Sequence, residues 1–267
     1  MIEFFFSKYN PFLKIFLFFY LLFDFIFQNI IIVFERGESV DERFSRTVRV
    51  IGEENMNKIQ NSSAIVFGLG GVGGAAAESL VRAGVGRIGI VDKDVVDITN
   101  VNRQIIATDD TVGMKKTDAL EKRLLSINPA LKIDKYDLFY LPETADSVDL
   151  IKYDFIVDCI DNVTAKLELI VRAERVGIPI ISSMGTGNKL HPEMLKIADI
   201  NKTSVCPLAR VMRRELKKRN ISKLTVVYSE EEPVKTDSSV PGSMSFTPPV
   251  AGYLITSFVI RSICDIK

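Results

Sequence analysis

A glycine-rich loop between a short apolar run and an alanine-rich segment constrains the fold of this chain most. The run AIVFG covers 64–68, the loop GLGGVGG covers 68–74, and AAAESLVRAG follows at 75–84. The apolar run predicts a buried strand, and the segment that ends at Gly84 predicts a helix with a glycine C-cap. RIGIVD at 87–92 predicts a second strand. Together these segments form one βαβ unit of about 30 residues, which predicts a parallel sheet.

The same alternation of helices and strands continues along the chain. Helices are predicted at 53–60, 113–128, 162–177, 206–220 and 250–263, and strands at 132–137, 153–161, 178–183, 194–200 and 223–229. This pattern predicts an α/β fold with a Rossmann-like, doubly wound and mainly parallel sheet, extended by a carboxyl-terminal α/β portion. We expect a ligand at the carboxyl ends of the strands.

Two late segments have compositions of their own. The segment 230–245 is polar and contains Pro and Gly, which predicts a mobile loop. The helix predicted at 250–263 is apolar but contains Arg261 and has fewer residues than a bilayer span needs, about 18 or more. We therefore expect it to be buried in the protein.

The first 34 residues differ in composition from the rest of the chain. The stretch 12–34 is rich in Phe, Leu and Ile and exceeds the roughly 20 residues of a bilayer span. Asp24 would cost roughly 2.5–3.5 kcal/mol at the membrane centre, which about ten such residues at roughly −0.5 kcal/mol each can outweigh. A signal peptide fits poorly, because no small-residue cleavage site follows. Either the stretch is a membrane anchor, or AT-rich DNA upstream of the true start codon encodes it.

Charge and cysteine content exclude several classes of protein. Lys and Arg together number 34, as do Asp and Glu, so no global basic field indicates nucleic acid. Cys159, Cys206 and Cys264 are widely spaced without a CxxC pair, so neither a zinc knuckle nor a disulfide framework is supported. We expect a reduced, cytoplasmic protein, with membrane anchoring through 12–34 as the alternative.

The glycine loop is suited to binding a phosphate group. Gly68, Gly70, Gly71 and Gly73 let the backbone approach a ligand, and the following helix directs its first amides at an anion. Asp92 ends the second strand, 24 residues after Gly68, where a carboxylate can bind ribose hydroxyls. These residues alone fit a site for NAD as well as one for ATP. The alternative is that the glycines bind no ligand and only form a tight turn that packs the helix on the strand.

The stretch VDKDVVDITNVNRQ, residues 91–104, favours a triphosphate. It places Asn100, Asn102, Arg103 and Gln104 within five residues. A hydride-transfer enzyme has no evident use for this group beside the ribose. The negative charge of a triphosphate must be neutralised by the protein, and cleavage puts further negative charge on the leaving pyrophosphate. Arg103 and Lys116 can donate several hydrogen bonds to those oxygens.

Asp161 ends the strand predicted at 153–161, and its carboxylate is expected to hold Mg²⁺. His191 is the only histidine and an unsuitable general base, so the chemistry would depend on charge neutralisation. The alternatives are a surface salt bridge for Arg103, a solvated helix face for Lys116 and a helix N-cap for Asp161.

Four motifs together resemble the ubiquitin-activating-enzyme-like adenylating superfamily, whose members attach AMP to a carboxylate. The motifs are GLGGVGG (68–74), VDKDVVDITNVNRQ (91–104), VGMKKTD (112–118) and VDCIDN (157–162). Within that superfamily, RFSRT, NVNRQI, SINP, IPIISSMGTGNK, IADINKT and PLARVMRRELKK resemble the tRNA threonylcarbamoyladenosine dehydratases. The resemblance covers about residues 42–267.

The resemblance implies a reaction and a site. ATP activates the carboxylate of the modified adenosine in tRNA, and the carbamoyl group then closes a ring with loss of water, so no enzyme nucleophile is needed. The implied ATP site consists of Gly68, Gly70, Gly71, Gly73, Asp92, Asp94, Asn102, Arg103, Gln104 and Lys116, with Asp161 as the Mg²⁺ ligand. Arg103, Lys116 and Asp161 are the implied catalytic residues. Arg46 matches an arm arginine that reaches the partner's nucleotide in a homodimer.

Three other functions stay open. Relatives that adenylate sulfur-carrier proteins commonly carry paired CxxC motifs, which this chain lacks. A non-catalytic nucleotide-binding adaptor and an NAD oxidoreductase are the remaining alternatives. A sulfur-relay partner such as a cysteine desulfurase also stays open. Cys206 precedes a helix, where a thiol pKa can be lowered, but a tolerated small residue explains it as well.

A basic stripe on the predicted helix 206–220 fits an RNA partner. Arg210, Arg213, Arg214 and Lys217 follow i, i+3, i+4, i+7 spacing and share one helix face. Such a stripe can neutralise tRNA phosphates, whereas an ordinary solvated surface is the alternative.

The expected organisation has four parts: an apolar leader (1–34), an amino-terminal arm (35–62), an ATP-binding Rossmann-like part (63–187) and a substrate- and tRNA-binding part of the same domain (188–267).

Overall fold

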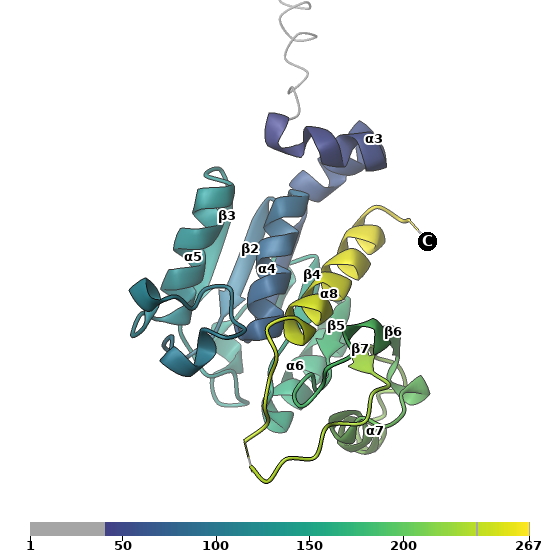
Figure 1. The fold of residues 1–267 in the computed structure, drawn as a ribbon. Coiled ribbons are helices and arrows are strands. Elements are labelled where there is room, and N and C mark those ends of the chain that lie inside the picture. Colours follow the sequence, from purple (N-terminus) through teal and green to yellow (C-terminus); the bar gives the residue numbers. More distant parts are fainter. Residues whose placement is uncertain (1–40, 239, 267) are drawn as a thin grey trace, which may run out of the picture. The chain divides into compact units, whose positions relative to one another are not determined.

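The computed structural model describes residues 41–238 and 240–266 (Figure 1). The anchor hypothesis for 12–34 concerns residues outside these ranges, so it stays a prediction. Among the described residues, no helix combines the length and apolar character that a membrane crossing needs.

Strands in the described part of the chain form one seven-stranded sheet. They are β1 (Ser63–Phe67), β2 (Arg87–Val91), β3 (Lys132–Tyr136), β4 (Phe155–Asp158), β5 (Ile180–Ser183), β6 (Leu195–Asp199) and β7 (Thr225–Ser229). Their order is β3-β2-β1-β4-β5-β7-β6, and neighbours are parallel except β6 and β7. The predicted fold class is confirmed. The chain order switches direction between β1 and β4, where such sheets open a ligand crevice.

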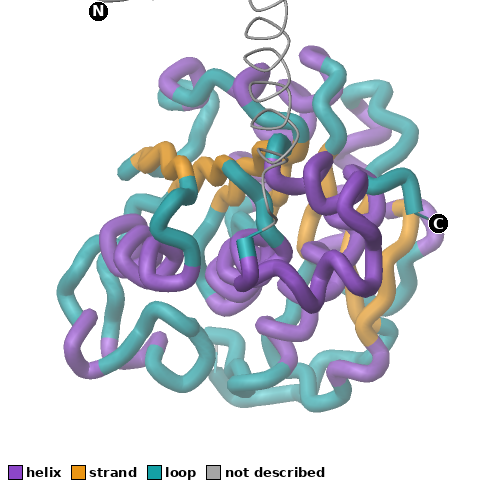
Figure 2. The backbone as a smooth tube through the Cα atoms, turned by 90° about the horizontal axis from the view of Figure 1, so that it is seen from above, coloured by secondary structure: helices purple, strands orange, loops and turns teal. Residues whose placement is uncertain are grey.

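Helices cover both faces of this sheet (Figures 1 and 2). They are α3 (Ser45–Gln60), α4 (Gly71–Ala83), α5 (Lys116–Ile127), α6 (Val163–Val176), α7 (Pro207–Lys218) and α8 (Thr247–Ile263). Helices α4, α5 and α8 pack on one face, and α6 and α7 pack on the other. Each predicted helix is present, although α4 begins at Gly71 rather than at residue 75. The prediction at 53–60 missed the first half of α3, because Gly52 has non-helical angles (φ 80°, ψ 163°) and interrupts it.

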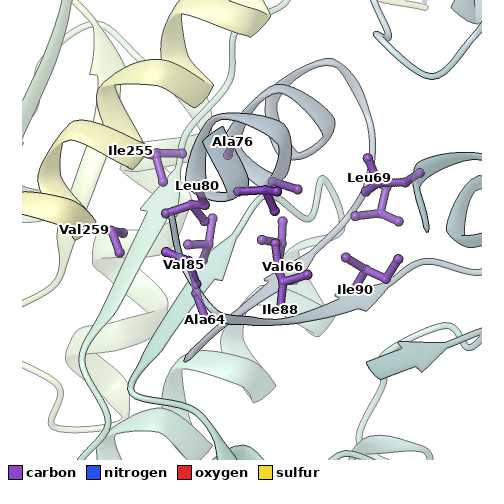
Figure 3. Packing of buried hydrophobic residues seen from close by; sticks show 14 of the residues in the cluster. Ala64, Val66, Leu69, Ala76, Leu80, Val85, Ile88, Ile90, Ile255 and Val259 are labelled. Carbon is purple, nitrogen blue, oxygen red and sulfur yellow. The ribbon is translucent and has the colours of Figure 1, made fainter. Parts of the chain in front are cut away.

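The main core lies between the sheet and the helix pair α4 and α8. Figure 3 shows these side chains gathered there: Ala64, Val66, Ile88, Ile90, Ala76, Leu80, Ile255 and Val259. Burying one such large aliphatic side chain stabilises the fold by roughly 1.5–3 kcal/mol. Helix α8 approaches α4 closely at Gly252, where a Cβ would lie 2.5 Å from the carbonyl oxygen of Val72. The prediction that 250–263 is buried in the protein is therefore confirmed.

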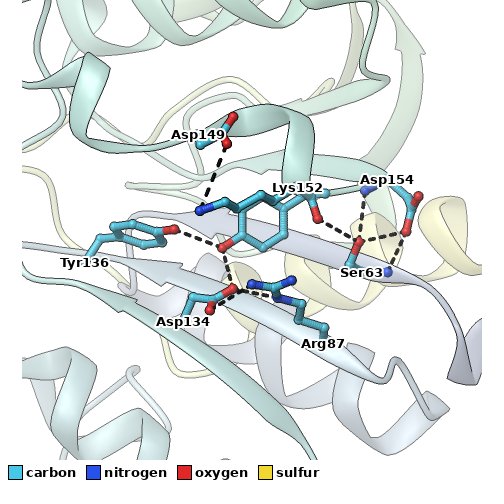
Figure 4. Close-up of polar contacts among 8 residues, drawn as sticks. Ser63, Arg87, Asp134, Tyr136, Asp149, Lys152 and Asp154 are labelled. Carbon is cyan, nitrogen blue, oxygen red and sulfur yellow. Dashed lines mark hydrogen bonds and ion pairs between the residues drawn. The ribbon is translucent and has the colours of Figure 1, made fainter.

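A polar network on the other face fixes the first three strands relative to one another (Figure 4). The guanidinium of Arg87 donates to both carboxylate oxygens of Asp134, at 2.7 and 3.1 Å. The hydroxyl of Tyr153 donates to the same carboxylate at 2.7 Å. Ser63 donates its hydroxyl to Asp154 at 2.7 Å. Arg87 and Asp134 are partly exposed, so this pair is worth at most about 1 kcal/mol and mainly fixes the strand register.

The segment 230–245 has no regular helix or strand among its described residues, as predicted. Its predicted mobility is not tested. Several of its backbone groups bond to the loop after β5: for example, Val234 donates its N–H to the carbonyl of Asn188 at 2.8 Å, and Gly242 donates to the Asn188 side chain at 2.6 Å.

Candidate functional site

A pocket of about 730 Å³ opens at the carboxyl ends of the parallel strands. Segments that follow β1, β2, β4 and β5 form its walls, so it straddles the switch between β1 and β4. The sequence-predicted residues that line it are Gly68, Gly70, Gly71, Asp92, Asp94, Asn100, Arg103, Gln104, Lys116 and Asp161. Gly73, Asn102 and Arg46 were also predicted, but they do not line it.

The glycine loop leaves room for a ligand above the first turn of α4. Gly70 is the N-cap and offers no side-chain hydrogen bond, so the first amides of α4 face the pocket without a capping group. Gly68 has a φ of +83°, and a Cβ there would lie 2.7 Å from the carbonyl oxygen of Cys159. At Gly73 a Cβ would lie 1.8 Å from the carbonyl oxygen of Gly68. Gly73 therefore permits the tight turn rather than lining the pocket.

Asp92 and Lys116 form the wall beside β2. The carboxylate of Asp92 accepts backbone N–H groups from Leu69 at 2.7 Å and Asp94 at 2.8 Å, which fixes its orientation. The ammonium of Lys116 lies 3.0 Å from Asp94 and 3.9 Å from Asp92, and its side chain is 8% exposed. The alternative of a solvated helix face for Lys116 is therefore wrong. Burial alone would raise the pKa of Asp94, but hydrogen bonds from Lys116 and Lys93 outweigh it and lower that pKa.

Arg103 and Gln104 also line the pocket and belong to the loop after β2. One guanidinium nitrogen of Arg103 donates to the Thr99 carbonyl and to the Asn102 side chain, both at 2.9 Å. Asn102 in turn donates to the carbonyl of Ser243 at 2.9 Å, so it positions Arg103 from outside the pocket. No carboxylate of a described residue pairs with Arg103, and the salt-bridge alternative is not found. The Oε1 atom of Gln104 is buried without a hydrogen-bond partner in the described structure.

Asp161 follows β4 and lines the pocket, and hydrogen bonds hold the preceding Ile160 in place. Asn162 caps α6 by accepting the N–H of Ala165 at 3.0 Å, so the N-cap alternative for Asp161 is wrong. Asp158, three residues earlier, forms an ion pair of 2.9 Å with Lys166, and both side chains are fully buried. No group of three or more His, Cys, Asp or Glu residues in the described chain could hold a metal ion. A single carboxylate still fits Mg²⁺, which in nucleotide sites takes one or two carboxylates plus phosphate oxygens and water.

Sequence reasoning missed several parts of the pocket wall, and three of them bear on the chemistry. The first is Tyr140, 3% exposed, whose hydroxyl has no partner in the described structure and whose ring packs edge-on against Phe67 at 4.8 Å. The second is the loop after β5, from Met184 to Lys189. The third is 240–243, from the late polar loop. The GTGNK run after β5 was a signal for the second part, since glycines at a strand end mark close approach.

A comparison with protein families decides where this chain belongs. The model described as the ThiF family matches residues 44–267. The chain belongs to the ThiF family. Membership confirms the resemblance to adenylating enzymes that the glycine loop and the strand-end motifs indicated.

Relatives of this ThiF-family chain cover nearly its whole described length. The tRNA threonylcarbamoyladenosine dehydratase of Bacillus subtilis is 39% identical over 239 residues, 83% of this chain and 94% of the relative. The Escherichia coli dehydratase TcdA, solved with AMP, matches with a TM-score of 0.81 and 31% identity over 86% of this chain and 96% of that one. The same enzyme solved with ATP gives a TM-score of 0.79.

Cys206 lines the pocket and is buried, whereas the residues predicted for the dimer and for the tRNA contact lie outside it. Arg46 is exposed on α3. On α7, Arg210, Arg214 and Lys217 are exposed, but Arg213 is half-buried and donates to the carbonyls of Thr203 at 3.1 Å and Ile200 at 3.3 Å. Arg213 therefore fixes the segment before α7 rather than presenting its charge to solvent.

Proposed function

We propose that this chain catalyses the ATP-dependent dehydration of threonylcarbamoyladenosine in tRNA. The observation that carries the proposal is the pocket itself, where a glycine loop faces Arg103 and Lys116. Relatives aligned over almost their entire length are dehydratases of this name, one solved with ATP and AMP. Residues 63–187 would bind ATP, and 188–267 would bind the tRNA substrate.

The pocket offers a suitable partner for each part of ATP. The amides at the start of α4 suit the phosphates, and Asp92 suits the ribose. The buried hydroxyl of Tyr140 and the Oε1 atom of Gln104 lack partners in the described structure, and a bound nucleotide or substrate would supply them. The Phe67 and Tyr140 rings offer an apolar wall for the base.

The proposed reaction has two bond exchanges. A carboxylate oxygen of the threonyl group attacks the α-phosphorus of ATP, and pyrophosphate leaves. The carbamoyl group then attacks the acyl carbon, AMP leaves and a ring closes, so the nucleoside has lost the atoms of one water and the displaced proton passes to solvent. The attacking group is tethered to the acyl carbon, which favours ring closure.

Charge neutralisation is the main task of the protein in this reaction. Arg103 and Lys116 would hold phosphate oxygens as charge builds on the leaving pyrophosphate. Lys116 is oriented for this by Asp94, at 3.0 Å. Mg²⁺ supplies further neutralisation of the phosphates when bound, and Asp161 would be its protein ligand.

Two surfaces would complete the enzyme. We propose a homodimer in which Arg46 reaches the nucleotide of the partner, and a tRNA contact through the exposed Arg210, Arg214 and Lys217. We also propose a cytoplasmic location, since ATP and tRNA are the substrates.

Mass spectrometry of nucleosides from tRNA incubated with the protein and ATP tests the function. We expect threonylcarbamoyladenosine to lose one water only when ATP is present. Pyrophosphate exchange driven by the carboxyl terminus of a sulfur-carrier protein, ATP binding without AMP release, or tight binding of NADH would each contradict it.

Two further experiments test the finer assignments: one measures Mg²⁺ dependence, and the other mixes two inactive variants. Asp161→Asn should abolish activation by Mg²⁺, and an unchanged Mg²⁺ dependence would refute the assignment. Arg46→Ala and Arg103→Ala should each be inactive as pure proteins. Because a mixed dimer retains one site with both arginines, mixing the two variants should restore activity, and a mixture without activity would refute the shared site.

A further inference from the structure

Lys189 places a buried positive charge in the wall of the pocket. It is the last residue of the loop after β5 that lines the pocket, and it is 3% exposed. Its ammonium donates to the backbone carbonyl of Glu231. No carboxylate of a described residue forms an ion pair with it. Burial of an ammonium costs several kcal/mol unless a partner compensates it, and the nearby Glu231 carboxylate compensates Lys189 only in part, because it forms no ion pair with it.

The nearest carboxylate is already committed to other donors. Glu231 is 7% exposed, and its two carboxylate oxygens accept the backbone N–H groups of Leu190 at 2.8 Å and His191 at 2.9 Å. Burial would raise the pKa of Glu231, but these backbone hydrogen bonds and the nearby charges of His191 and Lys189 together outweigh it and lower that pKa. Burial lowers the pKa of Lys189, and the charges of Cys206 and Glu231 offset this only in part. The Glu231 carboxylate therefore accepts from backbone N–H groups and not from Lys189. The Lys189 ammonium can still donate hydrogen bonds to a ligand.

Hydrogen bonds with Thr247 and Gly242 hold the chain at Lys189 and the preceding Asn188. The hydroxyl of Thr247 donates to the Lys189 carbonyl at 3.1 Å. The preceding Asn188 exchanges hydrogen bonds with Gly242 at 2.8 and 2.6 Å. A side chain held this way meets a ligand in one orientation, as binding residues require.

The sheet order indicates which ligand group Lys189 faces. Along the sheet, β2 carries Asp92 for the ribose, β1 carries the glycine loop for the phosphates, and β4 carries Asp161. The next strand is β5, whose loop carries Lys189. The nucleotide therefore extends from β2 toward β4, and the β5 side of the pocket is left for the group that attacks the α-phosphate. Met184 and Leu208 give that side an apolar lining.

We propose that Lys189 binds the carboxylate of the substrate's threonyl group and holds it beside the α-phosphate of ATP. This inference rests on the proposed function and names the residue that selects its substrate. A lysine ammonium has three donors, and the Glu231 carbonyl uses one. Two donors remain for the two carboxylate oxygens. Substrates without the negative charge would be rejected, because the ammonium would then stay buried without an anion.

Steady-state kinetics on the full-length protein test this role. Wild type, Lys189→Met and the control Lys152→Met are compared on tRNA that carries threonylcarbamoyladenosine. Lys152 is an exposed lysine that pairs with Asp149 at 4.0 Å, outside the pocket (Figure 4). For Lys189→Met we expect kcat/KM for the modified tRNA to fall about 10- to 100-fold, the value of one charge-assisted hydrogen bond. The Kd for ATP should change less than about twofold, because the lost contact is with the other substrate. Lys152→Met should resemble wild type in both.

A competition experiment separates recognition from a structural role. The competitor is the same tRNA with its threonyl carboxylate converted to the amide, which removes the charge but not the shape. Wild type should bind the acid form about tenfold more tightly than the amide form, and Lys189→Met should bind both equally. A variant that merely disturbed packing would weaken both forms alike.

The kinetic and binding results distinguish a failure of this proposal from a failure of the proposed function. An unchanged kcat/KM in Lys189→Met, or a loss of ATP affinity with tRNA binding retained, overturns the proposal. If Lys189→Met does not fold, wild type decides alone: equal binding of the acid and amide forms overturns it, and preference for the acid supports it. A wild type that removes no water from modified tRNA refutes the proposed function instead.

Discussion

The side chains of Asp158 and Lys166 form an ion pair of 2.9 Å that is completely shielded from solvent. The same two side chains hold one backbone residue from both directions. Ile160 donates its N–H to the Asp158 carboxylate at 3.1 Å, and its carbonyl accepts from the Lys166 ammonium at 2.9 Å. Asp161 comes next in the chain, so this pair sets where the proposed Mg²⁺ ligand enters the pocket.

Lys166→Met should destabilise the protein by about 3–5 kcal/mol, because the Asp158 carboxylate would remain buried without its cation. Urea denaturation at neutral pH measures this. Lys135→Met is the matched control: this lysine pairs with Asp118 and Glu121 at the surface, and its loss should cost less than about 1 kcal/mol. Equal losses for the two variants would show that burial of the pair carries no special weight.

Gly70→Ala should fold normally but bind ATP more weakly, by about tenfold or more. A Cβ at Gly70 meets nothing closer than the Gln104 amide at 3.9 Å, so the protein itself has room for it. The added methyl would occupy space where a phosphate approaches the helix amides. Gly185→Ala is the control, since it lines the same pocket with nothing within 4 Å. Calorimetric titration with ATP compares the two, and normal affinity in Gly70→Ala would place the phosphates elsewhere.

Arg103→Ala should lower AMP formation about 10²–10³-fold and leave the melting temperature nearly unchanged. The guanidinium is expected to stabilise charge on the phosphates, and its bonds within the protein are to partly exposed groups. Arg82→Ala, a surface arginine that pairs with Glu78, is the control. AMP release from modified tRNA and ATP is the measurement, and near-normal turnover in Arg103→Ala would remove it from the catalytic set.

Lys189→Met should be more stable than wild type at neutral pH, by on the order of 1 kcal/mol or about 2–4 °C in Tm. Burial lowers the pKa of Lys189 below its ordinary 10.5, so between the two values the unfolded chain binds more protons than the folded one. Wild-type stability therefore gains from rising pH in that window, and the advantage of the variant should shrink there.

Thermal unfolding of both proteins from neutral to alkaline pH checks this, with exposed Lys235→Met as the control that should show no such change. A constant difference between Lys189→Met and wild type across the range would show that the charge of Lys189 is already compensated in the fold.

Two neighbouring arginines on α7 should behave differently. Arg214→Ala should weaken tRNA binding and reduce the slope of log K against log salt by about 0.9, as expected for one lost phosphate contact. Arg213→Ala should instead destabilise the fold by about 1–3 kcal/mol, because the Thr203 carbonyl loses its donor and the Ile200 carbonyl loses one of its donors. Filter binding at several salt concentrations and urea denaturation distinguish them. A salt slope that changes only in Arg213→Ala would reverse these assignments.

Local pattern was sufficient for the fold class and for the glycine loop and strand-end residues of the pocket. Strands at 64–68 and 87–92 and the helix between them follow from apolar spacing and glycine punctuation, which act over a few residues. Because parallel strands end at one edge, Gly68, Asp92 and Asp161 were expected together before any contact was known, and the pocket contains all three.

Burial and long-range partners could only come from the tertiary structure. The ammonium of Lys189 meets the carbonyl of Glu231 across 42 residues of chain, and Asn102 meets Ser243 across 141. Their spacing on α7 predicted that Arg213 and Arg214 share one basic face. Packing of the preceding segment half-buries Arg213 and leaves Arg214 exposed. The sequence by itself determined which residues reach the strand ends, since that depends on short-range periodicity. Only the packed chain decided which charges are shielded from solvent, since the dielectric around a group depends on everything folded against it.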